Sequence, residues 1–205
     1  MRLEIYLNEE SKAIFKDYSK ENIDKIINTL HKDCKIYIKL IKSSKNIAKR
    51  TEFSGGSESL FRKGYIRKDR KPTDMSIEGQ KKFDELFQRK FNWKVRSAGS
   101  YTYIHDLYNV SDFDNSNAYY FPIGKFDYIW SPHIQDLFYG DSNDEDGDTE
   151  NLTYDYEKIV NGFIMNKGFE RVVNQEVVWR CKSYYLLNLY GIKETKEIIK
   201  RIIDI

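Results

Sequence analysis

The feature that most constrains the fold is a change of residue pattern part-way along the chain. Over residues 19–33, apolar side chains recur at helical spacing behind Ser19, a typical N-cap, and share one face: Ile23, Ile26, Ile27 and Leu30. From residue 93 onward, three runs rich in β-branched and aromatic residues predict strands: residues 93–105, 117–130 and 176–190. Helices followed mainly by strands are typical of an α+β domain with an antiparallel or mixed sheet.

The other segments fit the same organisation. The further expected elements, in chain order, are a short strand or extended arm at residues 1–18, a helical or mixed stretch at 36–41, a loop at 53–59, a strand at 59–68, a helix at 76–91 capped by Thr73 or Asp74, a helix at 154–166 that stops at Gly168, and a helix at 193–204. We therefore expect a single domain over residues 1–205, in which residues 1–50 form an N-terminal helical portion.

The composition indicates a soluble chain rather than a membrane protein. Charged residues make up 32% of the 205 residues, the mean hydropathy is −0.70, and no run approaches the roughly 18 apolar residues of a membrane helix. The charged start of the chain, MRLEIYLNEE, argues against a secretory signal, so we expect a cytoplasmic protein. Cys34 and Cys181 cannot form a disulfide framework, and with no CxxC or HExxH motif we expect two buried or half-buried thiols and no metal site.

Charge is unevenly distributed, although the net charge is only +2. Positive charge collects over residues 32–96, whereas residues 141–150 are almost purely acidic. With Gly147 at position 6 of an EF-hand loop, position 12 is Thr153 rather than the bidentate glutamate that calcium requires. We therefore expect residues 141–150 to form a solvated, mobile segment.

Three features stand out in chain order on expected strands. They are Arg62 in SLFRKGY, the hydroxyls of Ser97 and Ser100 in VRSAGSYTY, and Glu176 in VNQEVVWRCKSYYLL. In this order they resemble the arginine–serine–glutamate class of the ADP-ribosyltransferase family. The resemblance covers residues 58–190, and the stretches RKDRKPTD, KVRSAGSYTY, FPIGKFDYIWSP and NQEVVWRCKSYYL are also similar to uncharacterised proteins of tailed phages.

The resemblance implies a split antiparallel or mixed sheet and a mono-ADP-ribosyltransferase that moves ADP-ribose from NAD to a macromolecule, with a host protein as the expected acceptor. Glu176 would be the catalytic carboxylate, because negative charge stabilises the oxocarbenium character that develops when the nicotinamide–ribose bond breaks. Arg62 would hold the NAD pyrophosphate through charge-assisted hydrogen bonds, and Ser97 and Ser100 would contact the ribose. Three aromatic side chains are candidates for stacking on the nicotinamide ring: Tyr101, Tyr103 and Phe121.

Acceptor selection is implied for Asn174 and Gln175, the two residues before Glu176. The family carries Gln or Glu two residues before its catalytic glutamate, whereas this chain has Asn174 there, so the preferred acceptor stays open. The expected chemistry needs no metal. A phage-encoded enzyme of this kind would act in the host cytoplasm.

The residues leave several alternatives open. Arg62 lies among other basic residues, and Arg67 or Arg70 could equally be the functional guanidinium. A second interpretation is a catalytically inactive binding or virion-associated protein that blocks a host complex. A third is a nucleic-acid binder that uses residues 62–71 and Arg96, whereas no membrane partner is expected.

Overall fold

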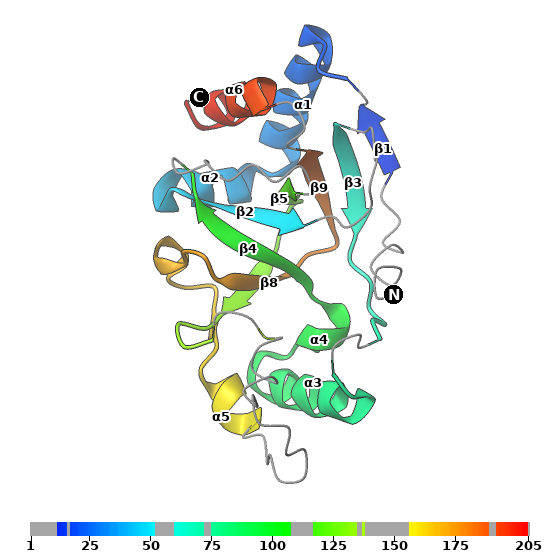
Figure 1. Ribbon diagram of the computed structural model, residues 1–205, viewed down its shortest axis with the longest axis vertical. Coiled ribbons are helices and arrows are strands. Elements are labelled where there is room, and N and C mark those ends of the chain that lie inside the picture. The colour runs from blue at the N-terminus through cyan, green and yellow to red at the C-terminus, as the bar shows by residue number, and fades with distance from the viewer. Residues whose placement is uncertain are drawn as a thin grey trace, which may run out of the picture.

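A computed structural model of the chain describes residues 12–15, 17–51, 60–71, 75–107, 117–134, 137, 156–188 and 192–204. Over these residues helices combine with an antiparallel sheet, which confirms the α+β class (Figure 1). The strands are β1 (Lys12–Phe15), β2 (Asn46–Thr51), β3 (Phe61–Tyr65), β4 (Ser100–Asp106), β5 (Asn117–Pro122), β6 (Asp127–Trp130), β7 (Ile164–Met165), β8 (Glu176–Arg180) and β9 (Ser183–Asn188). The helices are α1 (Lys20–Asp33), α2 (Lys35–Ser44), α3 (Ile77–Phe91), α4 (Val95–Ala98), α5 (Tyr156–Asn161), α6 (Ile192–Asp204) and the 3-10 helix η3 (Phe169–Arg171).

The described strands form one sheet of nine strands, in the order β1-β3-β9-β5-β2-β4-β8-β6-β7. Each neighbouring pair is antiparallel. The expected strand runs 117–130 and 176–190 each divide into two strands that belong to different halves of the sheet. The chain therefore crosses between the halves at residues 123–126 and 181–182.

The two halves of the sheet are joined where β2 pairs with β5, from Lys49 to Thr51. One residue earlier, the Ala48 amide instead donates a hydrogen bond of 2.8 Å to the hydroxyl of Tyr37 on α2. The Tyr37 ring packs edge-on against Phe121 of β5 and Trp179 of β8, with centroids 5.8 and 5.5 Å away. Tyr37 thus contacts both halves where they diverge. Figure 1 shows β3 and β9 running steeply in the view, whereas β2 and β8 run across it.

Side-chain caps set the starts of the long helices. Ser19 caps α1 by accepting a hydrogen bond of 3.4 Å from the Asn22 amide, as the sequence predicts. Helix α3 begins at Ile77 because Ser76 accepts a hydrogen bond of 2.9 Å from the Gly79 amide. The prediction of a cap at residue 73 or 74 is therefore wrong.

The first difference from the expected strands lies in residues 93–105. Residues 95–98 form the short helix α4, and the strand begins only at Ser100. The cause is the buried carboxylate of Asp84 on α3, which accepts hydrogen bonds from the amides of Arg96 (2.7 Å) and Ser97 (3.3 Å) and so fixes a helical turn.

The second difference lies in residues 154–166. Helix α5 ends at Asn161 instead of continuing to Gly168, and β7 follows and pairs with β6. Lys90 stabilises this early end because its ammonium donates hydrogen bonds to the carbonyls of Val160, Asn161 and Phe163, at 3.0, 2.9 and 3.2 Å.

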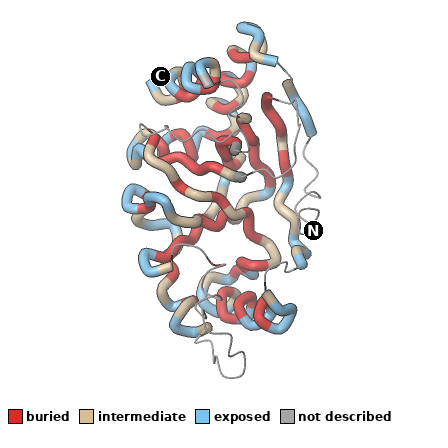
Figure 2. The backbone as a smooth tube through the Cα atoms, viewed as in Figure 1, coloured by how far each residue is buried: buried red, intermediate tan, exposed pale blue. Residues whose placement is uncertain are grey.

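Buried apolar side chains form two clusters, and Figure 2 shows the buried stretches along the sheet strands and the inner sides of the helices. The larger cluster joins α1, α2 and α6 to the sheet, and the smaller joins α3, α4 and α5 to β6 and β8. Cys34 is buried and Cys181 half-buried, as expected. Three expected segments lie outside the described residues: most of the arm at 1–18, the loop at 53–59 and the acidic segment at 141–150.

Replacing Tyr37 by phenylalanine tests the junction between the two halves. The substitution keeps the ring but leaves the buried Ala48 amide without its partner, so we expect the free energy of unfolding to fall by about 1–3 kcal/mol. Tyr65→Phe, at a ring that is 43% exposed, is the matched control and should change stability by less than about 0.5 kcal/mol. Denaturant unfolding measures both variants, and equal effects would contradict the role given to the Tyr37 hydroxyl.

Candidate active site

Four side chains form a transverse row on one face of the sheet. The register aligns Tyr119 of β5 with Lys49 of β2, Lys49 with Tyr103 of β4, and Tyr103 with Glu176 of β8. Because side chains directly opposite one another in a sheet lie on the same face, the row brings a cation and a carboxylate to either side of Tyr103. Glu176 is the first residue of β8, which confirms the expectation that it opens a late strand.

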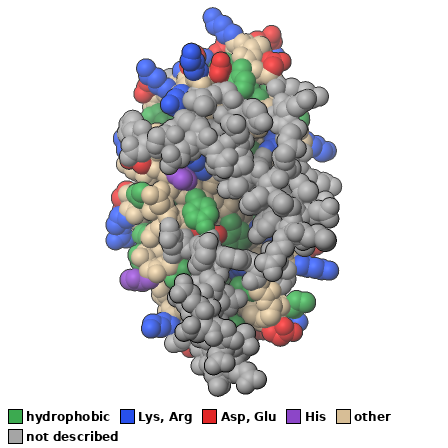
Figure 3. All heavy atoms as spheres, in the orientation of Figure 1, with side chains coloured by type: hydrophobic (Ala, Val, Ile, Leu, Met, Phe, Trp, Pro, Cys, Tyr) green, Lys and Arg blue, Asp and Glu red, His purple; other side chains and the backbone are tan. Residues whose placement is uncertain are grey.

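The row lies on the side of β4 whose side chains are partly exposed, but only Tyr103 and Glu176 are partly exposed, because Lys49 and Tyr119 are buried at 3% and 1% exposure. Along β4, Ser100, Thr102 and Ile104 are buried, whereas Tyr101, Tyr103 and His105 alternate with them and are partly exposed. Figure 3 shows hydrophobic side chains near the centre of the view, over β4 and β8. The face therefore combines aromatic rings with the carboxylate of Glu176.

Two guanidinium groups lie over the ring of Tyr101, next to the row. The guanidinium carbons of Arg70 and Arg96 are 5.6 and 5.5 Å from the ring centroid, within the range of cation–π contacts. The Tyr101 hydroxyl donates a hydrogen bond of 3.1 Å to the Val95 carbonyl. Burial is the main cause of a raised pKa at Tyr101. The positive charges of Arg96 and Arg70 act to lower this pKa, and the carboxylates of Glu176 and Asp84 act to raise it.

Backbone contacts hold Glu176 in position. Its Oε2 atom accepts a hydrogen bond of 3.0 Å from the Leu137 amide. The Ile104 amide donates to the Gln175 carbonyl (3.0 Å), and the Asn174 amide donates to the Ile104 carbonyl (2.8 Å). Ile104 of β4 thus holds the two residues that precede β8 through both of its backbone groups. Asn174 itself adopts a positive φ of 53°, a left-handed conformation that asparagine tolerates better than most residues. Asn174 and Gln175 thus lie directly beside Glu176.

A polar network on α3 positions the two arginines. The Gln80 amide nitrogen donates to the Arg70 carbonyl at 2.7 Å and to the Ser97 hydroxyl at 3.1 Å. The Ser97 hydroxyl donates to the Asp84 carboxylate, which also binds the Arg96 amide. Arg70 and Arg96 are therefore tied to the same helix through their main chains. Sequence reasoning missed Gln80 and Asp84, because nothing local distinguishes them from other polar residues of an amphipathic helix.

Arg62 lies in a different cluster, on the buried side of the sheet. It is 7% exposed, and its guanidinium interacts electrostatically with Tyr184 and Arg50. Arg50 donates hydrogen bonds from Nη1 to the hydroxyls of Ser100 (3.1 Å) and Tyr184 (3.0 Å). Burial lowers the pKa of the Arg62 guanidinium, and the positive charge of Arg50 lowers it further.

The structure therefore divides the predicted site residues between two places. Arg62 and Ser100 share the buried cluster around Arg50. Glu176 and Arg70 are partly exposed on the other side of β4, and Arg96 is buried there at 9% exposure. Ser97 lies in α4 rather than on a strand and bonds to α3. Of the aromatic candidates for stacking, Tyr101 and Tyr103 are partly exposed, and Tyr101 also packs against the smaller apolar cluster. Phe121 is fully buried against Tyr37.

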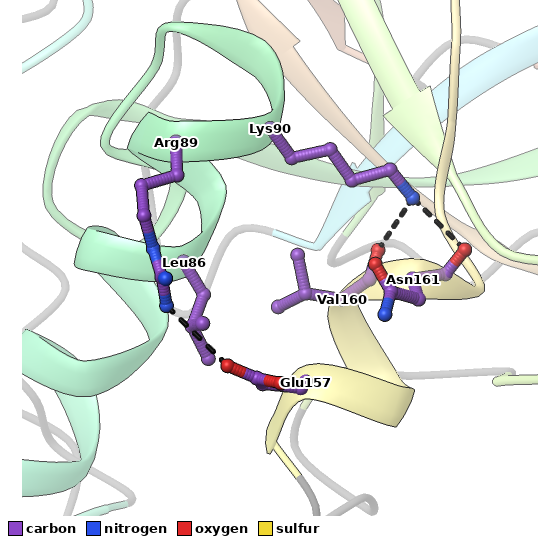
Figure 4. Close-up of a pocket in the computed structure, with 6 residues that line it drawn as sticks. All are labelled: Leu86, Arg89, Lys90, Glu157, Val160 and Asn161. Carbon is purple, nitrogen blue, oxygen red and sulfur yellow. Dashed lines mark hydrogen bonds and ion pairs between the residues drawn. The ribbon is translucent and has the colours of Figure 1, made fainter.

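A separate shallow pocket lies between α3 and α5 (Figure 4). Its polar groups bind one another: Arg89 forms an ion pair with Glu157 at 3.5 Å, and Lys90 donates to the α5 carbonyls. Partial burial lowers the pKa of Lys90. These contacts account for the pocket as part of the packing of α5 on α3.

Comparison of the chain with models of protein families, with curated proteins and with solved structures found no match. The described residues hold no cluster of three or more potential His, Cys, Asp or Glu metal ligands. Within the same part of the chain, none of the helices has the length and apolar character needed to cross a membrane.

The α3 network yields a prediction about Asp84. Asp84→Ala removes three hydrogen bonds to a buried carboxylate, so we expect the free energy of unfolding to fall by roughly 2–3 kcal/mol. Glu85→Ala, at the neighbouring exposed position of α3, is the control and should be close to neutral. Denaturant unfolding compares the two variants. If both variants lost stability equally, the effect would come from the substitution of any α3 residue and not from the hydrogen bonds of Asp84.

Proposed function

We propose that the half-exposed face binds NAD and that the protein is a mono-ADP-ribosyltransferase with Glu176 as its catalytic carboxylate. The observation that carries the proposal is the position of Glu176 in a row with Tyr103, beside a Tyr101 ring that two guanidinium groups contact. Guanidinium groups suit a pyrophosphate, aromatic rings suit a planar base, and a carboxylate suits developing positive charge on a ribose.

Each group has a defined part in the proposed reaction. Arg70 and Arg96 hold the pyrophosphate, and Tyr101 or Tyr103 packs against the nicotinamide ring. The bond between nicotinamide and the ribose C1′ atom breaks, and nicotinamide leaves with the bonding electron pair. Glu176 stabilises the oxocarbenium character of the ribose while a nucleophile of the acceptor attacks C1′ and gives up its proton. When water is the nucleophile, the same steps hydrolyse NAD.

The acceptor would approach the side of Glu176 on which Asn174 and Gln175 lie, because these residues precede it at the edge of the same face. We propose a protein acceptor, and a host protein in the cytoplasm if the chain is encoded by a phage. Asn174 offers a neutral amide there, which favours hydrogen bonding to the acceptor over an ionic contact.

One observation favours a second candidate, a binding protein without catalytic activity. Glu176 Oε2 already accepts a hydrogen bond from the Leu137 amide. A carboxylate with a purely structural role would make the same kind of contact with the backbone. Such a protein would act by occupying a host complex. It would release no nicotinamide but would retain a stable partner from a host extract.

The charge of Glu176 provides the central test. Glu176→Gln keeps the size and the hydrogen-bonding capacity of the side chain, so the affinity for NAD should change little. Nicotinamide release should fall roughly 10²–10³-fold, because one preorganised charge is lost from the transition state. Asn174→Ala is the control and should leave NAD hydrolysis intact while it weakens transfer to the acceptor. A folded Glu176→Gln protein with the turnover of the parent would remove Glu176 from the mechanism.

The guanidinium that binds the pyrophosphate can be identified by comparing three variants. If the half-exposed face binds NAD, Arg70→Ala should raise the dissociation constant about 10- to 100-fold, the value of one charge-assisted contact. Arg67→Ala should have little effect, because Arg67 pairs with Asp69 at the surface. Calorimetric titration measures each affinity. A selective loss in a folded Arg62→Ala protein would instead support the site implied by the family resemblance.

A further inference from the structure

A surface of lysines lies on and around α2, away from the proposed active site. The helix contains no acidic residue, and Lys35, Lys39 and Lys42 recur at positions i, i+4 and i+7, which lie on one side of a helix. The apolar residues Tyr37, Ile38 and Ile41 face the core. Along the chain, Lys32 precedes this series and Lys45 follows it directly.

A sixth lysine joins the surface from another part of the chain. The Gly124 amide, in the turn between β5 and β6, donates a hydrogen bond of 2.9 Å to the Asp33 carbonyl at the end of α1. This contact holds the exposed Lys125 beside the junction of α1 and α2. The acidic residues nearest in sequence are already bonded: the Asp33 carboxylate accepts a hydrogen bond of 2.7 Å from the Tyr185 hydroxyl, and Asp127, two residues after Lys125, pairs with Arg180 at 2.6 Å.

Most lysines of this surface form no ion pair within the described fold. Among the described residues, no ion pair involves any of five of its members: Lys32, Lys35, Lys39, Lys45 and Lys125. Five or more cations that share one convex surface repel one another, and a polyanion relieves that repulsion while it releases its own counterions.

We propose that the lysine surface binds the phosphate backbone of nucleic acid without sequence selection. Helix α2 has 10 residues and so extends about 15 Å, a length over which one strand presents a phosphate about every 3.4 Å along the helix axis. Lysines supply point charges rather than the bidentate groups that read base edges, which explains the expected lack of sequence selection. An anionic membrane is disfavoured because Ile36 is the one large apolar side chain exposed on α2, too little for insertion.

Fluorescence anisotropy with a labelled DNA duplex and a labelled single-stranded RNA tests this proposal on the full chain. We expect binding at 50 mM salt that weakens steeply by 200 mM. The double variant K35E/K39E should bind at least tenfold more weakly than the parent and reduce the salt slope by about two, one for each lost phosphate contact. The control K81E/K82E, at two exposed lysines of α3, changes the net charge equally and should keep the parent affinity.

The proposal is overturned if the parent binds neither nucleic acid, or if K81E/K82E weakens binding as much as K35E/K39E. Binding that does not depend on salt would also overturn it. Co-sedimentation with phosphatidylserine vesicles in place of nucleic acid would assign the surface to membranes instead. Because no step uses NAD, the result is independent of the proposed transferase activity, and equal melting temperatures of the two double variants ensure that folding is not the cause.

Discussion

The hydrogen bond from the Ala48 amide to the Tyr37 hydroxyl is the contact around which the sheet is arranged. A buried amide without a partner costs free energy, so β2 can leave β5 at this residue only because a side chain replaces the strand. The Tyr37 hydroxyl on α2 accepts this hydrogen bond, and the Tyr37 ring packs against Trp179 of β8. The same side chain therefore caps the end of the β2–β5 pairing and contributes to the apolar core. β4 pairs with β2, and β8 pairs with β4, on the side of β2 opposite β5.

This arrangement explains why the two faces of β4 differ so strongly. The buried face packs Ser100, Thr102 and Ile104 against the core, and Thr102 also accepts a hydrogen bond from the Trp179 indole at 2.7 Å. The opposite face keeps its tyrosines partly exposed and aligns them with Glu176. A single strand thus belongs to the rigid core on one side and to the proposed active site on the other, which is a favourable base for holding reacting groups in fixed geometry.

Features that depend on neighbouring residues were predictable from the sequence, and features that depend on distant contacts were not. Apolar periodicity and the Ser19 cap locate α1, and the run of β-branched residues after Glu176 locates the start of β8. The turn of α4 depends instead on Asp84, and the end of α5 depends on Lys90, 70 residues earlier than the first carbonyl it binds. The grouping of Arg70 with Arg96 likewise arises from contacts of α3 that no local pattern reveals.

The two arginine clusters differ in what they can offer a ligand. Arg50 already donates hydrogen bonds to two hydroxyls, so it contributes to the internal polar structure of the sheet. Arg62 beside it is buried, and an anion would have to enter the core to reach it. Arg96 is also buried, at 9% exposure, whereas Arg70 is half-buried over the Tyr101 ring that the two arginines share. An anion can therefore reach Arg70 from solvent. Two like charges on one ring also repel, and a bound pyrophosphate removes that repulsion. The exposure of Arg70 is therefore the reason to place the proposed nucleotide site there rather than at Arg62.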